Sequence, residues 1–397
     1  MDNNPTIGAS LILIVDDNPK NLQVLGNYLQ LEGYLVEFAL NGEAALDWTR
    51  RAEFDLILLD IMMPVMDGFE VCKAIKKETM NQKTPVIFLT AKIDTESIIN
   101  AFDLGAVDYV IKPFNQKELI ARVKTQIEIK RSRDEIAKNL KEIELKNKLI
   151  TYSIEYAQRI QAAVLKASQK GSELFGEIFC LILPRDIVSG DFYWFHKIEN
   201  KLLAGVFDCT GHGIPGAFMS MLGVTLLNET VIREKITRPN LILNRLREKI
   251  IEALGQKGIM SEVRDGMDGS IISYDPATRT LIYSGAFNPM YLIRGNRIIE
   301  FKADRMTLSY QDINSDFSYQ EIKTLPDDLI YLSTDGFTDQ FGGAEEKKFR
   351  RAQFRDVLLK NNKNTLAVQK EMLLDTYNRW KGDGEQVDDI TVVGLRL

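Results

Sequence analysis

Histidine and cysteine are the scarcest chemically useful residues in this chain. Its 397 residues include two histidines, His196 and His212, and three cysteines, Cys72, Cys180 and Cys209. No two cysteines form a CxxC pair, which argues against a structural zinc site, a Cys–His nucleophile system and a disulfide framework. Any metal or phosphoryl chemistry in this protein must therefore depend on carboxylates.

Two further absences narrow the class of protein. No apolar run approaches the roughly 18 residues that suggest a membrane span, and the first ten residues lack the pattern of a secretory signal. Lys plus Arg total 50 against 56 Asp plus Glu, a net charge of −6, so the chain has no excess positive charge for nucleic acid or anionic membrane. We therefore expect a cytoplasmic protein that binds neither nucleic acid nor a membrane. The length of the chain suggests two or three domains.

Residues 9–131 alternate short apolar runs with amphipathic stretches, which predicts an α/β domain with a five-stranded parallel sheet. The expected strands are Leu11–Val15, Tyr34–Ala39, Asp55–Asp60, Pro85–Thr90 and Val107–Ile111. In such sheets the functional residues lie at the carboxyl ends of the strands. Asp16, Asp17, Asp60, Thr90 and Lys112 all fall there.

The three carboxylates of Asp16, Asp17 and Asp60 form an oxygen-only cluster of the kind that suits Mg²⁺. A hydroxyl from Thr90 and an ammonium from Lys112 could bind the oxygens of a phosphoryl group on Asp60. An aspartate that forms an acyl phosphate is an established nucleophile.

These residues resemble the receiver domains of response regulators. The resemblance rests on VDDNP at 15–19, DIMMPVMDG at 60–68, Thr90, Tyr109 and KPF at 112–114. It implies that Asp60 accepts a phosphoryl group from a sensor histidine kinase or a phosphotransfer protein. It further implies that Asp17, Asp60 and the Met62 carbonyl bind Mg²⁺ and that Asp16 contacts the ion through water. Thr90 and Tyr109 become the switch pair, and Lys112 contacts the phosphoryl group.

Residues 115–165 lose the strand pattern and read as one long charged helix, from which we expect a helical linker at 132–171. Asn115 with Glu118 resembles a capping box that opens the helix. A heptad frame follows, with Asn147 at a position that often specifies a parallel dimer. Its members are Ile136, Leu140, Ile143, Asn147, Ile150, Ile154, Ala157, Gln161 and Val164. We expect a parallel homodimeric coiled coil; the alternative is an amphipathic helix that packs on its own domain, most readily around Ala157 and Gln161.

Residues 172–397 are rich in strands, with helices grouped at about 215–254 and 350–380, which is an α+β pattern. The expected strands are 177–183, 192–198, 202–208, 269–274, 280–284, 290–294, 328–333 and 390–395. Aspartates recur beside glycines in SGDFYW (189–194), FDCTGHGIPGAFMSM (207–221), STDGFTD (333–339) and VDDITVV (387–393). Several acids without a cysteine suit two divalent cations, which can activate water for hydrolysis.

These four motifs resemble the metal-dependent Ser/Thr protein phosphatases of the PPM family, in particular the SpoIIE-type branch. The resemblance implies a β-sandwich fold and two Mn²⁺ or Mg²⁺ ions. Asp208 would bridge the ions, the Cys209 carbonyl would be a ligand, and Gly211 would lie beside them. Asp335 and Asp388 would complete the second metal site. Asp191 would hold water on the first ion, and Asp389 would support the ligands.

Three accessory residues have two possible roles each. His212 is either structural or an acid near the site, and Asp268 is either a turn residue, which we favour, or a weak substitute for a third-metal ligand. Arg185 is a candidate phosphate contact, with a solvated arginine as the alternative. The loop Ser284–Pro289 lacks the acid that some PPM enzymes place there.

Together these features predict a two-component response regulator with a phosphatase output, controlled by phosphorylation of Asp60. The resemblance suggests a small regulatory phosphoprotein, such as an anti-sigma-factor antagonist, as substrate. The alternative is a non-catalytic scaffold that binds a phosphoprotein. No basic recognition helix follows the receiver, so a DNA-binding output is not expected.

Overall fold

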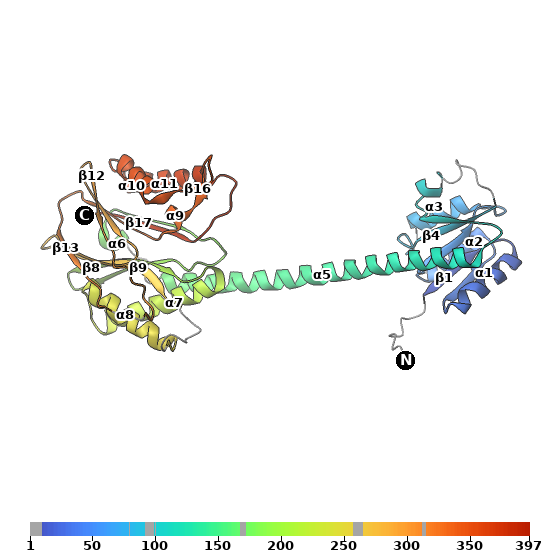
Figure 1. Ribbon diagram of the computed structural model, residues 1–397, viewed down its shortest axis with the longest axis horizontal. Helices are drawn as coiled ribbons and strands as arrows, with labels where there is room; N and C mark the ends of the chain where they lie inside the picture. The colour runs from blue at the N-terminus through green and yellow to red at the C-terminus, as the bar shows by residue number, and fades with distance from the viewer. Residues whose placement is uncertain are drawn as a thin grey trace. The chain divides into compact units, whose positions relative to one another are not determined.

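The computed structural model describes residues 10–78, 80–91, 99, 101–166, 172–256, 265–311 and 315–397 (Figure 1). The chain divides into two compact units, Met1–Asn147 and Lys148–Leu397. Residue 9 and residues 167–171, at the ends of the predicted receiver and linker, lie outside the described residues. Among the described helices, none has the length and apolar character needed to cross a membrane.

The first unit is built on a parallel sheet of five strands in the order β2-β1-β3-β4-β5. Its strands are β1 (Leu11–Val15), β2 (Leu35–Ala39), β3 (Leu56–Asp60), β4 (Val86–Thr90) and β5 (Asp108–Ile111). Strands β3 and β4 are buried along their whole length, as expected of strands covered on both faces. The predicted strands are confirmed to within one residue.

Helices cover both faces of this sheet. They are α1 (Pro19–Leu31), α2 (Gly42–Arg51), α3 (Gly68–Glu78) and the first part of α5 (Gln116–Lys166). Leucines of α1 pack with Leu119, Val123 and Ile127 of α5 against one face, while α2 and α3 pack against the other. The side chains of Asn18 and Asn41 cap α1 and α2.

Helix α5 starts directly after Asn115, whose Oδ1 accepts a hydrogen bond from the Glu118 amide at 3.2 Å. The Glu118 carboxylate accepts a hydrogen bond from Arg122 at 3.0 Å. The predicted capping box therefore forms through the Asn115 side chain, whereas the Glu118 side chain is bonded to Arg122. Beyond the receiver core four apolar heptad residues are exposed, namely Ile136, Leu140, Ile143 and Ile150, with Leu140 at 61%. This stretch of helix therefore has an apolar stripe that its own domain does not cover.

The second unit is a sandwich of two antiparallel sheets, in the orders β13-β10-β9-β8-β7 and β12-β11-β14-β17-β6. The first contains β7 (Phe192–Ile198), β8 (Lys201–Cys209), β9 (Met267–Asp275), β10 (Thr280–Ala286) and β13 (Gln320–Lys323). The second contains β6 (Ile178–Leu183), β11 (Met290–Arg294), β12 (Arg297–Phe301), β14 (Leu329–Ser333) and β17 (Ile390–Arg396). A small hairpin joins β15 (Phe341–Gly342) to β16 (Lys347–Lys348).

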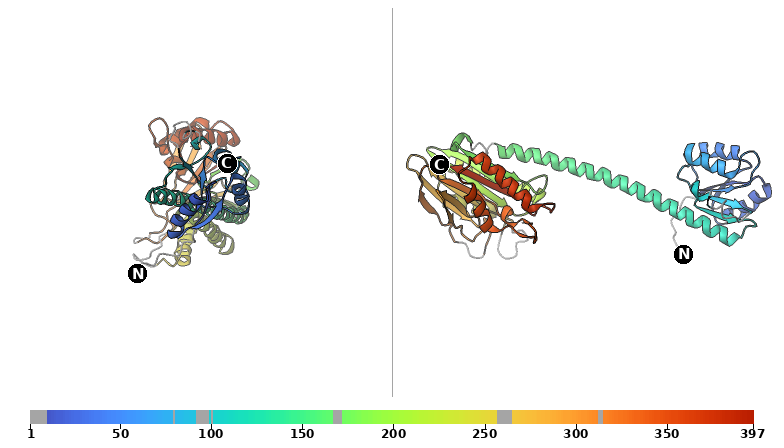
Figure 2. Two further views of the ribbon diagram at one scale, coloured as in Figure 1. Left: turned by 90° about the vertical axis from the view of Figure 1, so that its right-hand side faces the viewer. Right: turned by 90° about the horizontal axis from the view of Figure 1, so that it is seen from above.

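A helical layer covers each outer face of the sandwich (Figure 1 and Figure 2). The helices of the second unit are α6 (Ser172–Phe175), α7 (Gly213–Asn228), the π-helical turn η1 (Glu229–Arg233), α8 (Pro239–Ala253), α9 (Gly336–Asp339), α10 (Arg350–Asn361) and α11 (Leu366–Lys381). Helices α7 and α8 pack on the first sheet, and α10 and α11 pack on the second. A third apolar cluster fills the space between the sheets. The predicted α+β sandwich is confirmed.

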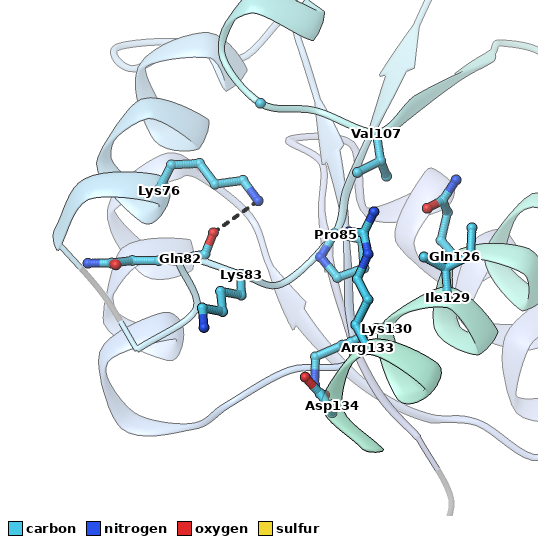
Figure 3. Close-up of a pocket in the computed structure, with 11 residues that line it drawn as sticks. Lys76, Gln82, Lys83, Pro85, Val107, Gln126, Ile129, Lys130, Arg133 and Asp134 are labelled. Carbon is cyan, nitrogen blue, oxygen red and sulfur yellow. Dashed lines mark hydrogen bonds and ion pairs between the residues drawn. The ribbon is translucent and has the colours of Figure 1, made fainter. Parts of the chain in front are cut away.

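A basic cavity of about 300 Å³ lies on the first unit, between the end of α3, the starts of β4 and β5, and α5 (Figure 3). Lys76 donates to the Gln82 and Thr84 carbonyls there, at 3.2 and 2.7 Å. Pro85 and Val107, which line the cavity, directly precede β4 and β5. The cavity is therefore at the opposite edge of the sheet from Asp60.

Candidate active sites

The first site lies at the carboxyl ends of β1 and β3. Oxygen atoms of Asp16, Asp17 and Asp60 all lie within 4.8 Å of one another. Asp16 and Asp60 are buried, whereas Asp17 is exposed. The structure therefore brings together the three acids that the sequence placed at strand ends.

Lys112, which follows β5, neutralises this cluster. Its Nζ lies 2.7 Å from Asp16 Oδ2 and 2.7 Å from Asp60 Oδ2. Burial raises the pKa of Asp60, although the bond from Lys112 opposes this effect. Burial acts to lower the pKa of Lys112, but its bonds to Asp16 and Asp60 outweigh burial and leave that pKa above its usual value.

Asp16 is held in place by neighbours that the motif comparison did not single out. The side-chain amide of Asn21 donates to both carboxylate oxygens at 3.0 Å, and the Asn18 amide donates at 2.9 Å. The Met62 amide lies 3.4 Å from Asp60 Oδ1. A Cβ on Gly68 would lie 2.2 Å from the Asp60 carbonyl oxygen, so this position requires glycine. The loop after β3 thus closes tightly on Asp60.

The predicted switch residues lie on the two strands beyond Asp60. Thr90 is buried at the end of β4, and its register partner is Ile111 of β5. Tyr109, two residues before Ile111 along β5, is the register partner of Phe88 on β4. The guanidinium of Arg122 lies 5.9 Å from the centre of the Tyr109 ring. Tyr109 is half-buried, and its contact with Arg122 joins the end of the sheet to helix α5.

The second site lies where β8, β14 and β17 meet at one edge of the sandwich. Asp208 and Cys209 end β8, Asp335 follows β14, and Asp388 precedes β17. Burial raises the pKa of Asp208 well above its usual range, and the neighbouring carboxylates raise it further. Asp335 shares a hydrogen bond with Asp208, and burial raises the pKa of Asp335 as well.

Asp268 lies in strand β9, directly opposite Asp208, and is not the turn residue that we favoured. Its flanking glycines suggested a turn, but Gly269 lies within the strand and Gly266 directly precedes it. Burial raises the pKa of Asp268 to about 6. Its Oδ1 is buried and has no hydrogen-bond partner among the described residues.

Asp191 and Asp389 are both buried and make different contacts. Asp191 Oδ2 accepts a hydrogen bond from the Thr334 hydroxyl at 2.7 Å. Asp389 Oδ1 and Oδ2 accept from the Arg185 and Gly190 amides, each at 2.7 Å. Both oxygens of Asp389 are thus engaged by backbone, which favours the supporting role expected of it.

Arg185 and His212 lie at the exposed rim of this site. The Arg185 guanidinium donates to the Val387 carbonyl at 2.8 Å, so it fixes the segment before Asp388. His212 precedes α7, and its Nδ1 lies 2.8 Å from Asp186 Oδ2. Gly211 has a φ of +85°, a conformation that glycine adopts readily. A Cβ on Gly216 would lie 2.3 Å from the Gly211 carbonyl oxygen, so α7 packs closely on this loop.

Both sites suit hard divalent cations. Their side-chain donors are carboxylate oxygens, which Mg²⁺ and Mn²⁺ prefer. In the second site, burial and the repulsion of neighbouring carboxylates raise the pKa values of the Asp191, Asp208 and Asp335 carboxyls. The unpartnered oxygen of Asp268 agrees with this interpretation. A divalent cation would relieve the repulsion in both places.

Gln161 of α5 joins the linker helix to the second site. It is 5% exposed, and its side-chain amide donates to the Ser189 carbonyl at 2.6 Å and to Ser220 Oγ at 2.9 Å. Ser189 lies two residues before Asp191, and Ser220 is on α7. Leu165 and Val164 pack nearby in the cluster beneath α7. The end of α5 therefore packs on the second unit. This is the alternative to a continuous coiled coil that the sequence left open for this stretch.

Two family models match the chain. The model described as response regulator receiver domain matches residues 12–124, and the model described as stage II sporulation protein E (SpoIIE) matches residues 199–397. Among solved structures, the SiaA-PP2C domain of Pseudomonas aeruginosa is similar, with a TM-score of 0.58 and 32% identity, covering 64% of this chain and 98% of that one.

Curated relatives match the first unit. The transcriptional regulatory protein ResD of Bacillus subtilis is 42% identical over 113 residues, which are 28% of this chain and 46% of ResD. The DNA-binding response regulator MtrA of Mycolicibacterium smegmatis is 40% identical over 129 residues, 32% of this chain and 54% of MtrA. The chain thus spans about half the length of these relatives.

The fold and the two acidic sites define a response-regulator receiver domain fused to a PPM-type protein phosphatase domain. The chain belongs to the SpoIIE family, whose model matches half of its length.

Proposed function

We propose that this protein is a response regulator whose output is the metal-dependent hydrolysis of phosphoserine or phosphothreonine on a protein. The observation that carries the proposal is the convergence of four acids, Asp191, Asp208, Asp335 and Asp388, at one edge of the sandwich. A binding scaffold has no need for such a costly cluster of like charges, in which Asp191 is buried and the other three carboxylates are half-buried. The proposed domains are a receiver at 9–131, a linker at 132–171 and a phosphatase at 172–397.

The phosphatase residues would hold two Mn²⁺ or Mg²⁺ ions. Bound cations of this kind lower the pKa of water and stabilise the departing oxygen. Asp208 would hold both ions, the Cys209 carbonyl would be a further ligand, and Asp335 and Asp388 would hold the second ion. Asp191, oriented by Thr334, would accept hydrogen bonds from water at the first ion. Asp389 fixes the Arg185 and Gly190 amides, so the loop that carries Asp191 keeps its place.

The receiver would take a phosphoryl group on Asp60 from a sensor histidine kinase or a phosphotransfer protein. Asp17, Asp60 and the Met62 carbonyl would hold Mg²⁺, with Asp16 acting through water. Lys112 already lies 2.7 Å from the acceptor carboxylate and can contact the phosphoryl oxygens. Thr90 and Tyr109 would then rearrange and pass the change to α5.

Helix α5 gives a direct covalent route between the two sites. Its first turns pack in the receiver core through Leu119, Val123 and Ile127. Its last turns bond Ser189 and Ser220 through Gln161. Rotation or displacement of the helix would therefore move the segment that carries Asp191 and the middle of α7, where Ser220 lies. This supports control of the phosphatase by phosphorylation of Asp60.

The exposed stripe on α5 supports a parallel homodimer. Ile136, Leu140, Ile143 and Ile150 are 53–61% exposed, and Asn147 lies in the same frame. An Ile143→Lys variant should shift the protein from dimer to monomer in sedimentation experiments, whereas Lys138→Glu, off the stripe, should not. A monomeric parent protein would contradict the dimer.

The substrate is proposed to be a small regulatory phosphoprotein of the anti-sigma-factor antagonist kind, which rests on the family resemblance. A cytoplasmic location agrees with the three free cysteines.

The test of the proposed output is Asp208→Asn, assayed for Mn²⁺- or Mg²⁺-dependent hydrolysis of a phosphoserine protein. The variant should lose hydrolysis yet still accept a phosphoryl group on Asp60. Asp356→Asn, on the exposed face of α10, is the matched control. Hydrolysis by the Asp208→Asn variant would refute the site, and phosphoprotein binding without hydrolysis by the parent would favour the scaffold.

A further inference from the structure

The loop between β10 and β11 lies at the same edge of the sandwich as the acidic site. Ala286, the last residue of β10, pairs with Gly269, which follows Asp268. Met290, the first residue of β11, pairs with Leu332, three residues before Asp335. Because the two strands belong to different sheets, residues 287–289 cross from one sheet to the other beside the acids.

Hydrogen bonds hold this loop in a fixed shape. The Phe287 amide donates to the Asp304 carbonyl at 2.8 Å, and the Asn288 amide donates to the Ala286 carbonyl at 2.7 Å. The Tyr283 hydroxyl donates to the Asn288 carbonyl at 2.8 Å. Asn288 is 3% exposed, and its Nδ2 has no partner among the described residues. The loop is rigid and keeps one buried donor free.

Phe287 is strained and exposed at the same time. Its φ is +57°, in the left-handed region that bulky residues rarely adopt. Its side chain is 39% exposed, so packing in the domain does not account for the strain. Backbone strain that is held by surrounding hydrogen bonds concentrates at binding and catalytic sites.

Other exposed apolar side chains occur on the segments that form the acidic site. Val387 directly precedes Asp388, Ile214 follows the Gly211–Gly213 turn, and Ile187 lies on the loop that leads to Asp191. Their exposed fractions are 36–43%. An acidic metal site that took only small phosphate esters would need no apolar residues on these segments.

We infer that Phe287 is a specificity-determining residue that contacts an apolar side chain next to the phosphoserine or phosphothreonine of the substrate. This inference rests on the proposed phosphatase function and names the substrate more closely. The substrate is a protein segment with an aliphatic or aromatic neighbour beside its phosphorylated residue. Ile187, Ile214 and Val387, on the segments that form the acidic site, would add further apolar contacts.

The experiment compares phosphoserine peptides that differ in one residue. Leucine or aspartate is placed at each position neighbouring the phosphoserine in turn, and kcat/KM is measured with Mn²⁺. The parent enzyme should favour leucine at one position by about tenfold, the size expected when an apolar anchor is lost from a protein interface. Phe287→Ala should reduce this leucine-to-aspartate ratio toward one, and Phe287→Leu should retain most of it.

Two further variants separate recognition from folding. Phe287→Gly removes the strain, so its unfolding midpoint should stay at or above that of the parent while the leucine preference disappears. Leu325→Ala removes an apolar residue that is 50% exposed at the opposite edge of the sandwich and should keep the preference. A lowered midpoint in Phe287→Gly together with an unchanged preference would show a structural residue and overturn the inference.

Hydrolysis of p-nitrophenyl phosphate by the parent enzyme separates a failure of the inference about Phe287 from a failure of the proposed phosphatase function. If the parent hydrolyses this ester but shows no preference for leucine, or if the preference survives in Phe287→Ala, the inference fails and the proposed function stands. If the parent hydrolyses neither the ester nor any peptide, the proposed function fails and the inference falls with it.

Discussion

Asp208 and Asp268 lie directly opposite each other on the neighbouring antiparallel strands β8 and β9. Carboxylates in this arrangement repel each other and destabilise a sheet. One oxygen of Asp268 is also buried without a partner among the described residues. The pair therefore holds electrostatic repulsion that a divalent cation can relieve.

Asp268→Asn should stabilise the metal-free protein at neutral pH, by on the order of 2 kcal/mol in the free energy of unfolding. Because burial raises the pKa of Asp268 to about 6, the folded protein binds more protons than the unfolded chain between roughly pH 4 and 6. Stability of the parent should fall as pH rises through this window, and the variant should lose that part of the fall. The measurement is denaturant unfolding in EDTA across this pH range, following the transition that Mn²⁺ shifts. Identical pH profiles for parent and variant would contradict the raised pKa of Asp268.

Lys112→Met should destabilise the receiver when Mg²⁺ is absent. The ammonium bonds two largely buried acids, and its removal leaves uncompensated charge at a cost on the order of 2 kcal/mol. Added Mg²⁺ should raise the thermal midpoint of the variant more than that of the parent. Lys124→Met, on the exposed face of α5, serves as the control. If both variants respond to Mg²⁺ as the parent does, Lys112 does not neutralise the acids.

Thr334→Val should lower kcat/KM by about 10- to 100-fold, because partners that orient a metal-site carboxylate typically have effects of this size. The hydroxyl donates to Asp191 at 2.7 Å and accepts from the Thr391 amide at 2.9 Å. Thr334→Ser keeps the hydroxyl and should retain most activity. Phosphatase assays over a range of Mn²⁺ concentrations provide the comparison, and equal losses in the two variants would show that packing of the methyl group matters instead.

Gln161→Leu should weaken the response of the phosphatase to phosphorylation of Asp60. The substitution keeps the apolar bulk of the side chain but removes its bonds to Ser189 and Ser220. The ratio of rates with and without phosphorylation should move toward one, while Gln158→Leu, exposed one turn earlier, should leave that ratio unchanged. A full response in Gln161→Leu would mean that the signal reaches Asp191 by another route.

The receiver could be predicted almost completely from its sequence. Its inner strands β1, β3 and β4 are largely buried and read as continuous apolar runs, and the acids at the strand ends share one edge by topology alone. In the second unit β12 and β13 were not foreseen. Both are edge strands with many polar residues, so their hydrophobic pattern is weak.

Side-chain partners across long sequence distances were the other part that the sequence did not reveal. Thr334 meets Asp191 across 143 positions, and no local spacing marks that contact. Gln161 was visible only as a polar interruption of a heptad pattern, which does not say whether a helix binds a second copy or its own domain. Asp268 was assigned to a turn because glycines flank it, whereas both glycines lie within or beside a strand.

The central claim is that one chain couples phosphorylation of Asp60 to hydrolysis of a phosphoprotein. The most direct test measures kcat/KM for a phosphoserine protein with Mn²⁺, with and without beryllofluoride as the phosphoryl mimic, in the parent protein and in Asp60→Asn. The account predicts a change of about fivefold or more in the parent, the lower end of ordinary coupling free energies, and none in the variant. Equal rates with and without the mimic in the parent would contradict it.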